Sequence, residues 1–240
     1  MNDRPLFVSD WSRALFVHYE VDPDVLQPQV PLPLDVRDGR AYVSLVAFTM
    51  RGLRLAAGGR LTAWLTAPIA THGLLNVRTY VKYQGEQAIY FMAEWIPNRL
   101  SVFAGPRTYG LPYRYGRLDY RHRHESGVIR GSVEPGSGGR LDWHASISPT
   151  VRFRPCETGS LSEFLLERYT AFTMAGRRLR QFRIRHEPWC QTPVDTVVDD
   201  DDALAATGPW HAAATLVSSC YSPGLDGVLM GRPRRVKRAR

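Results

Sequence analysis

Asn76-Val77-Arg78-Thr79-Tyr80-Val81 alternates between hydrogen-bonding and largely apolar side chains. Successive side chains of a strand point to opposite faces, so Asn76, Arg78 and Tyr80 share one face and the residues between them share the other. The segment therefore predicts a β-strand that buries one face and directs an amide, a guanidinium and a phenol to the other. These three groups need hydrogen-bond partners wherever the strand lies.

Further strand-like segments lie on both sides of this one. Ala41 to Phe48 is apolar at nearly every position, which is typical of a central strand covered on both faces. Many such segments and few helices favour a mainly β fold, an antiparallel β-barrel or cone-like double sheet with a few peripheral helices. The other predicted strands are 14–21, 88–95, 115–124, 128–134, 141–148, 151–154, 179–186 and 209–217.

Short helices interrupt the strands. Asp22 and Pro23 predict a helical turn through Leu26, because aspartate is a good N-cap and proline suits the first helical position. Ser160 and Glu163 form a capping box that predicts a longer helix with apolar residues at helical spacing through Phe172 and its end at Gly176. The acidic run that begins at Asp199 predicts a second short helix through Ala206.

Composition predicts one soluble domain over residues 1–231 and a basic tail over residues 232–240 that we expect to be unstructured. The chain has 240 residues, a formal net charge of +8 and three cysteines at wide spacing. That spacing supports neither a disulfide framework nor a metal site, and we expect no metal and no cofactor. No leader or membrane-spanning run of apolar residues is present, so we expect a cytoplasmic protein without a membrane partner.

The basic tail leaves a nucleic-acid partner as a less favoured alternative. The tail carries arginines that could release counterions from a polyanion, but it has no aromatic side chain to stack on a base. The sequence leaves open whether the protein forms a homo-oligomer.

Six segments match one family pattern together and in order, and the chain resembles the YqjF-like family of uncharacterised bacterial proteins from about Trp11 to Tyr221. This family is related to the acetoacetate decarboxylases, so the resemblance implies a closed β-barrel or cone around a central pocket. We expect that pocket to have the usual ligand-site volume of roughly a few hundred Å³. The segments are WSRALFVHY at 11–19, VPLPL at 30–34 with Asp38-Gly39, NVRTYV at 76–81, LPY at 111–113, SLSEFLLERY at 160–169 and HEPW at 186–189.

The resemblance also implies that one decarboxylase feature is missing. In those enzymes a Gly-Phe-Pro-Lys-Lys segment supplies the amine that forms a Schiff base with the substrate. The matching stretch here is Gly110 to Arg114, with Tyr113 and Arg114 in place of the two lysines. Arginine stays protonated and cannot serve as an amine nucleophile, so we do not expect Schiff-base decarboxylation. Lys82 could substitute if it reached the pocket, but a lysine near a strand end is more often exposed.

The candidate catalytic residues are Arg78, Glu94, His18 and Tyr113. Arg78 could clamp a carboxylate or enolate. Glu94, in an apolar strand, could move protons with a raised pKa or could pair with an arginine at the strand end. His18 could act as a general base or be a satisfied core histidine. Tyr113, a pocket candidate through the resemblance alone, could donate a hydrogen bond to a developing oxyanion.

The candidate ligand-binding residues are Asn76, Tyr80 and Arg114, the last through the resemblance alone. We interpret the HEPW and SLSEFLLERY segments as structural, with Arg168 and Tyr169 anchoring the helix to the barrel. The favoured function is a barrel that binds a small organic molecule, anionic or carbonyl-bearing. It could be a lyase, hydratase or isomerase that works by non-covalent acid/base chemistry. A non-catalytic ligand-binding or sensory barrel is the alternative.

Overall fold

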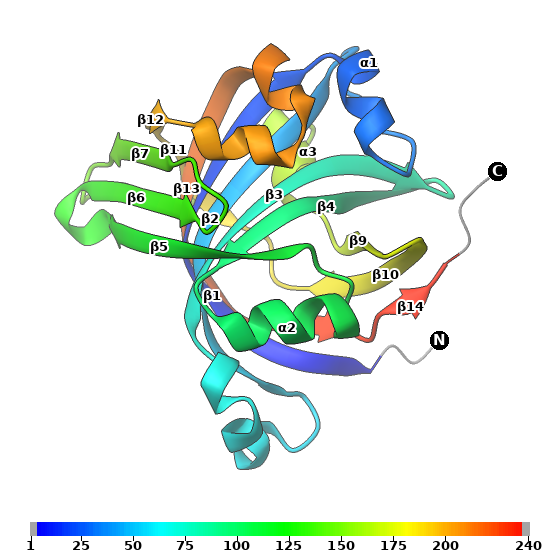
Figure 1. Ribbon diagram of the computed structural model, residues 1–240. Coiled ribbons are helices and arrows are strands. Elements are labelled where there is room, and N and C mark those ends of the chain that lie inside the picture. The colour runs from blue at the N-terminus through cyan, green and yellow to red at the C-terminus, as the bar shows by residue number, and fades with distance from the viewer. Residues whose placement is uncertain (1–3, 237–240) are drawn as a thin grey trace.

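The computed structural model describes residues 4–236, and strands dominate it (Figure 1). No helix in this range is long and apolar enough to cross a membrane. The strands are β1 (Pro5–Val21), β2 (Ala41–Leu55), β3 (His72–Tyr83), β4 (Glu86–Ile96), β5 (Tyr113–Arg123), β6 (Val128–Pro135), β7 (Leu141–Ser146), β8 (Arg154–Pro155), β9 (Thr170–Ala175), β10 (Arg178–Arg185), β11 (Cys190–Pro193), β12 (Asp195–Asp200), β13 (Thr215–Gly231) and β14 (Arg234–Arg235).

Helices are short. The α-helices are α1 (Pro23–Leu26), α2 (Arg99–Thr108) and α3 (Leu161–Leu166). The last of these ends at Leu166, which lines the barrel cavity. The 3-10 turns are η1 (Gln27–Gln29), η2 (Gly59–Leu65), η3 (Ala67–Ile69), η4 (His124–Ser126), η5 (Asp202–Thr207) and η6 (Pro209–Ala213).

Seven strands close a ring. The order is β4-β3-β2-β1-β13-β10-β9, and β9 returns to β4, so the sheet pairs with itself as a barrel. All of these ladders are antiparallel except the one between β4 and β9. The predicted mainly β fold with barrel closure is therefore confirmed.

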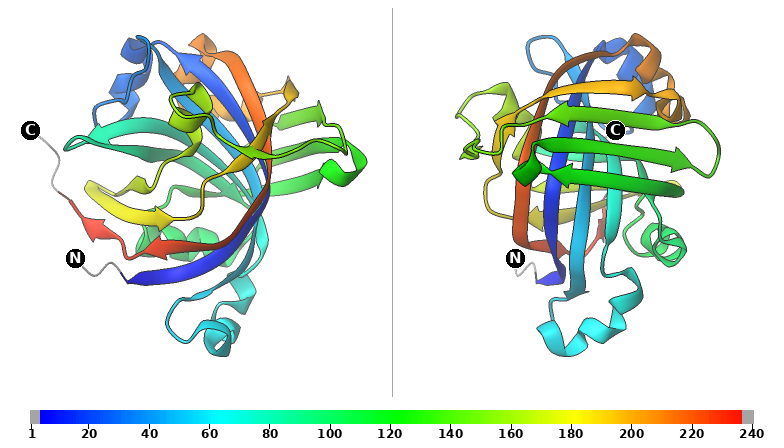
Figure 2. Two further views of the ribbon diagram at one scale, coloured as in Figure 1. Left: turned by 180° about the vertical axis from the view of Figure 1, so that it is seen from behind. Right: turned by 90° about the vertical axis from the view of Figure 1, so that its left-hand side faces the viewer.

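A side sheet continues from one edge of the barrel. β5 pairs in parallel with the end of β4, and β6, β7 and β12 follow as antiparallel neighbours. Figure 2 shows this sheet crossing the outside of β1, β2 and β3. Leu45 and Val77 lie in the apolar layer between the two sheets, whereas Val46 and Phe48 point into the barrel. This arrangement explains why residues 41–48 are apolar on both faces.

The helix predicted from Ser160 to Gly176 is wrong in its second half. Ser160 caps α3 as expected, but the helix ends at Leu166 and residues 170–175 form β9. Thr170 and Phe172 favour a strand, and this strand joins β10 to β4 and closes the barrel.

Other elements also differ from prediction. Asn98 caps α2, which was not predicted because Gly105 and Pro106 lie inside it. The last strand begins at Thr215 instead of Pro209, and the acidic run is divided between β12 and η5. β14 pairs with β10, so this part of the predicted tail is ordered, and residues 237–240 lie outside the described range.

Candidate functional site

Among the described residues, the interior of the barrel contains a small cavity of about 20 Å³. This volume suits about one water molecule. In this conformation the cavity is therefore much smaller than the ligand-sized pocket that we expected. Large aromatic side chains and the segment that carries α3 fill the remaining interior. The cavity is lined by Trp11, Val46, Phe48, Asn76, Arg78, Ile89, Phe91, Leu166, Arg168, Ile184, His186 and Trp189.

The polar face of β3 looks into the barrel, as the alternation predicts. Asn76 and Arg78 line the cavity and are buried. Tyr80, one pair further along the strand, is buried within the same interior layer. The structure therefore brings an amide, a guanidinium and a phenol to one enclosed surface.

A chain of hydrogen bonds connects His18 to this surface. His18 Nδ1 lies 2.6 Å from Ser44 Oγ, which lies 2.5 Å from the Tyr80 hydroxyl. Tyr80 donates to the Leu165 carbonyl at 2.9 Å. Burial, with the charge of Arg78 as a second cause, lowers the pKa of His18 to about 3, so this histidine is neutral at physiological pH. The chain brings a buried neutral imidazole within three hydrogen bonds of the α3 segment, residues 160–168.

Arg78 is a buried cation whose main acceptor is a peptide carbonyl. Its Nη2 donates to the Leu165 carbonyl at 3.0 Å, and its guanidinium lies 5.8 Å from the centroid of the Phe16 ring. Its Nε has no hydrogen-bond partner, and no ion pair to Arg78 is found within residues 4–236. A buried cation without a neighbouring carboxylate favours an anion at the same place.

A β-bulge turns Glu94 toward the barrel interior. Asn76 pairs with Glu94 and Val77 with Ala93, but Arg78 pairs with Phe91, so β4 has one extra residue at this point. Without the bulge, Glu94 and Phe91 would lie on opposite faces, because they are three positions apart. The bulge lets Asn76 Nδ2 donate to Glu94 Oε1 at 2.9 Å.

Glu94 is a neutral acid at physiological pH. Burial raises its pKa to about 8, and the hydrogen bond from Asn76 opposes this rise only in part. The second oxygen, Oε2, has no partner in the structure. Tyr113 pairs with Glu94 in the ladder between β5 and β4, and burial together with the nearby Glu94 raises its pKa well above the ordinary value. Glu94 and Tyr113 can therefore both donate a proton or a hydrogen bond near Asn76.

Arg114 and Lys82 lie away from the cavity. Arg114 follows Tyr113 on β5, so its side chain takes the other face, where it donates to the Ala206 carbonyl at 2.8 Å and approaches the Trp95 ring. Arg114 is therefore not among the residues that line the barrel cavity. The Lys82 side chain is 51% exposed and pairs with Asp35 at 3.0 Å, which agrees with the exposed alternative.

Sequence reasoning missed Asp35 as the partner that anchors the α3 segment. Arg168 Nη1 lies 2.7 Å from Asp35 Oδ2, and both side chains are 1% exposed. Gln87 donates to the same oxygen at 3.1 Å, and Arg168 Nε donates to the Phe164 carbonyl at 2.7 Å. The pair lies beside Tyr80, since the Arg168 guanidinium is 5.2 Å from the centroid of that ring. The buried ion pair therefore holds one wall of the cavity.

The HEPW segment, predicted to be structural, also forms part of the cavity wall. Trp189 stacks on Trp11 with 6.3 Å between ring centroids and meets the Phe16 ring edge-on at 5.0 Å. Glu167 accepts a hydrogen bond from the Trp189 backbone at 2.8 Å and thereby ties this segment to the α3 segment. The sequence did not identify these aromatic side chains as part of a site, because their pattern is equally typical of a hydrophobic core.

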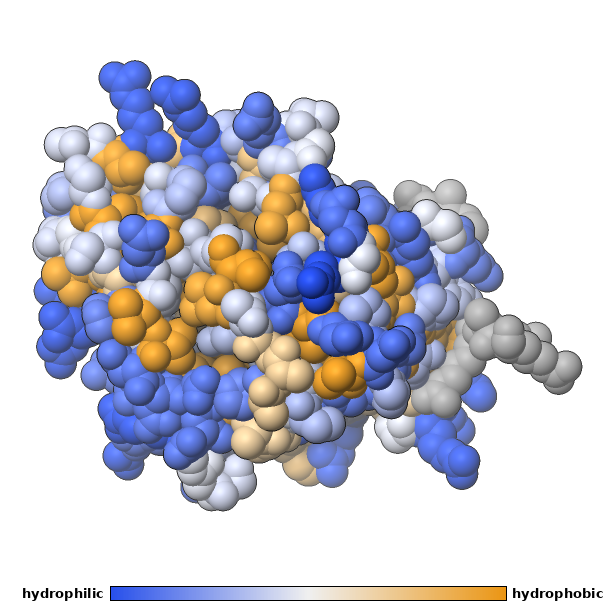
Figure 3. Space-filling model, turned by 90° about the horizontal axis from the view of Figure 1, so that it is seen from above, coloured by the Kyte–Doolittle hydropathy of each residue, from blue (hydrophilic) through white to orange (hydrophobic). Residues whose placement is uncertain are grey.

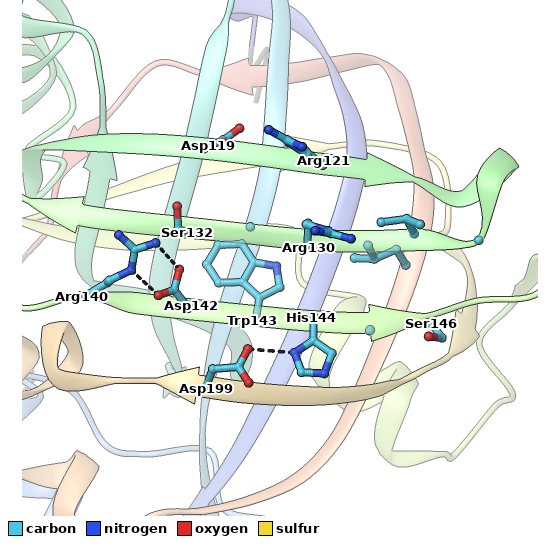
Figure 4. Close-up of a pocket in the computed structure, with 15 residues that line it drawn as sticks. Asp119, Arg121, Arg130, Ser132, Arg140, Asp142, Trp143, His144, Ser146 and Asp199 are labelled. Carbon is cyan, nitrogen blue, oxygen red and sulfur yellow. Dashed lines mark hydrogen bonds and ion pairs between the residues drawn. The ribbon is translucent and has the colours of Figure 1, made fainter.

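A larger hollow of about 660 Å³ lies on the outer face of the side sheet (Figure 4). It is open to solvent, and two pairs of its charged or titratable side chains contact each other. Arg140 pairs with Asp142, and His144 lies 2.8 Å from Asp199. Within residues 4–236, no group of three His, Cys, Asp or Glu side chains could hold a metal ion. The enclosed barrel interior remains the better candidate site.

The comparison with known proteins is consistent with this geometry. A family model described as an uncharacterized conserved protein, DUF2071, matches residues 8–226. The uncharacterized protein YqjF of Bacillus subtilis strain 168 is 30% identical over 197 residues, which cover 79% of this chain and 78% of YqjF.

Solved structures share the fold at low sequence identity. The enduracididine biosynthesis enzyme MppR, complexed with pyruvate, has a TM-score of 0.67 at 15% identity over 99% of this chain and 92% of its own. Acetoacetate decarboxylase from Legionella pneumophila has a TM-score of 0.67 at 12% identity over 99% and 90%. An acetoacetate decarboxylase-like enzyme from Sphingomonas wittichii RW1 has a TM-score of 0.67 at 17% identity over 98% and 94%.

Proposed function

Since this chain belongs to the DUF2071 family of uncharacterized conserved proteins, we propose that it binds a small organic anion inside its barrel. The observation that carries this proposal is the Arg78 guanidinium, which is buried without a carboxylate partner and donates to a backbone carbonyl. A carboxylate or enolate would offer this cation two charged acceptors. The pyruvate held by MppR, which has the same fold, supports a ligand of this size and charge.

Binding requires the α3 segment to move, because a cavity of about 20 Å³ cannot hold even a three-carbon acid. The Leu165 carbonyl occupies the position next to Arg78 and Tyr80 in the closed form. An anion would replace this carbonyl as the acceptor. Ligand affinity then includes the free energy of opening the segment.

Once an anion is bound, Glu94 is the group that would exchange a proton with it. At neutral pH its carboxyl group is protonated, and its unpartnered Oε2 is free to donate. Asn76 holds the other oxygen and fixes the carboxyl plane. This supports a lyase, hydratase or isomerase that acts without a covalent lysine intermediate. Neither lysine of the chain supports such an intermediate. Lys82 is half exposed and pairs with Asp35 away from the cavity, and Lys237 lies outside the described residues.

The test of binding is thermal unfolding with pyruvate as the probe. A ligand at a concentration 100-fold above its Kd should stabilise the wild type by about 2.7 kcal/mol, which is a clear rise in Tm. Arg78→Met should remove this rise while the protein stays folded, because the buried charge is replaced by an apolar chain of similar length. Arg121→Met, on the exposed face of the side sheet, is the matched control and should keep the rise. An Arg78→Met protein that pyruvate still stabilises would refute the proposal.

The test that separates an enzyme from a non-catalytic binder is exchange of the pyruvate methyl protons in D2O, followed by NMR. An acid/base site should accelerate this exchange, and Glu94→Gln should abolish the acceleration while pyruvate still raises the Tm. A wild type that binds pyruvate without accelerating exchange would leave the non-catalytic, sensory alternative.

A further inference from the structure

Charge is strongly segregated along this chain. The segments 39–85, 95–118, 168–186 and 227–240 contain no Asp or Glu, yet they carry 22 of the 31 Lys and Arg residues. The first segment includes the η2–η3 arm, residues 56–71, which projects from the barrel on the side opposite α1 (Figure 1). The other three contribute α2, the hairpin of β9 and β10, and the end of β13 with β14.

Hydrogen bonds join these elements into one surface, the basic end. Asn98, which caps α2, donates to the Pro68 carbonyl of the arm at 2.7 Å. At the other end of the helix, Arg180 of β10 donates to the Arg107 carbonyl at 3.1 Å. Tyr109 donates to the Gly231 carbonyl at 2.9 Å and so ties the helix to the end of β13. The arm therefore adjoins the beginning of α2, and β10 and β13 adjoin its other end.

The basic end also carries the most exposed large apolar side chains of the described residues. Leu61 is 86% exposed and Trp64 is 72% exposed, both in η2 at the projecting part of the arm. Phe103 of α2 is 58% exposed, and Leu65 and Leu100 are also exposed. The opposite end, seen from above in Figure 3, also has apolar patches among hydrophilic side chains.

Two cations of α2 have no carboxylate partner among the described residues. Within residues 4–236, neither Arg99 nor Arg107 forms an ion pair with a carboxylate. Both guanidiniums instead lie over aromatic rings: Arg99 over Tyr115 at 4.3 Å and Arg107 over Phe103 at 3.7 Å. One acid does flank the arm, since Asp10 lies opposite Arg51 in the ladder between β1 and β2.

We infer that the basic end docks on the surface of an anionic lipid membrane. Arginines attract the headgroups, while projecting leucine and tryptophan side chains enter the boundary between headgroups and acyl chains. Tryptophan is enriched at this depth because it is both apolar and able to hydrogen-bond. A nucleic acid could bind the arginines and stack on the aromatic rings, but it has no apolar surface to cover exposed aliphatic side chains such as Leu61.

A second copy of the chain fits this surface less well. If two basic ends met face to face, their arginines would repel one another, because these segments contain no acid to pair with them. The inference revises the sequence-based expectation of no membrane partner. That expectation depended on the absence of a spanning run, which a peripheral contact does not need.

The test is flotation of the full chain with vesicles made of phosphatidylglycerol and phosphatidylcholine in equal parts. We expect binding at low salt that weakens at high salt, and little binding to vesicles of phosphatidylcholine alone. Leu61→Ser with Trp64→Ser should weaken binding by at least about tenfold, because it removes the inserted apolar area. Arg99→Gln with Arg107→Gln should weaken it by about tenfold and reduce the salt dependence.

Matched controls lie on the side sheet, away from the arm (Figure 1). Val197→Ser removes a half-exposed apolar side chain from β12, and Arg130→Gln removes an exposed cation from β6; both should leave vesicle binding unchanged. Three results would each overturn the inference. The first is that the protein does not bind anionic vesicles at low salt. The second is that the Leu61/Trp64 variant binds vesicles as well as the wild type does. The third is that the wild type binds no vesicles but forms an oligomer in light scattering, which the Leu61/Trp64 variant converts to monomers.

Discussion

Replacing Asp35 with alanine should lower the free energy of unfolding by about 3–5 kcal/mol, the usual cost of leaving one member of a buried ion pair without its partner. The Arg168 guanidinium is almost fully buried, and burial already lowers its pKa. Its Nη2 has no hydrogen-bond partner even in the intact protein. Without Asp35, the remaining interactions of Arg168 are the Phe164 carbonyl and two aromatic rings. Urea unfolding of the two proteins measures the difference.

The loss should be asymmetric between the two partners. Arg168→Met should cost less than Asp35→Ala, because Lys82 and Gln87 still contact the carboxylate of Asp35. Asp35→Leu combined with Arg168→Met should recover most of the stability, since an apolar pair replaces two desolvated charges. Lys82→Met is the control, and it should cost less than about 1 kcal/mol because this side chain is half exposed. An Asp35→Ala protein as stable as Lys82→Met would contradict the role assigned to the pair.

The same variant should also affect the cavity. Arg168 belongs to the α3 segment, whose Leu165 carbonyl occupies the acceptor position next to Arg78. Loosening this anchor favours the open form, which binds the anion. Where Asp35→Ala remains folded, we therefore expect a lower apparent Kd for pyruvate despite lower stability.

The sequence predicts the strand faces of the site because alternation is a local property. The alternation of polar and apolar residues over 76–81 is enough to assign each side chain to one face of the strand. The structure places Asn76 and Arg78 on the cavity wall. The resemblance extends this to barrel closure, which no local pattern encodes. β9, the strand that completes the ring, follows a capping box and was predicted as helix because Arg168 and Phe172 fall at helical spacing.

The rest of the site depends on features without a local signal. Strict alternation would place Glu94 on the face opposite Phe91, and the bulge that reverses this depends on pairing with β3. Asp35 follows a proline-rich extended segment. Its partner, Arg168, lies 133 positions further along the chain. The arm contains none of the predicted strands or helices, and its exposed apolar side chains become informative only when α2 is found beside it.

Replacing Glu94 with glutamine should stabilise the protein increasingly as pH rises. The folded pKa of about 8 lies above the ordinary value of 4.5, so the folded state holds this proton more tightly than the unfolded state. Between these two values, each pH unit removes about 1.4 kcal/mol of stability from the wild type, or about 3 kcal/mol by pH 7. Glutamine keeps an oxygen for Asn76 and does not titrate, so the variant should lack this loss.

His18 imposes the opposite slope over part of the same range, which makes the pair of variants diagnostic. Its folded pKa of about 3 lies below 6.5, so stability falls as pH falls from 6.5 toward 3. Between pH 4.5 and 6.5 the two slopes oppose each other, and wild-type stability should be nearly flat. It should then decline toward pH 8 as Glu94 alone titrates. His18→Asn should convert the flat region to a fall with rising pH, and Glu94→Gln should convert it to a rise. If urea unfolding gives parallel pH profiles for the wild type and Glu94→Gln, then Glu94 is ionised in the folded protein and cannot be the proton donor of the barrel.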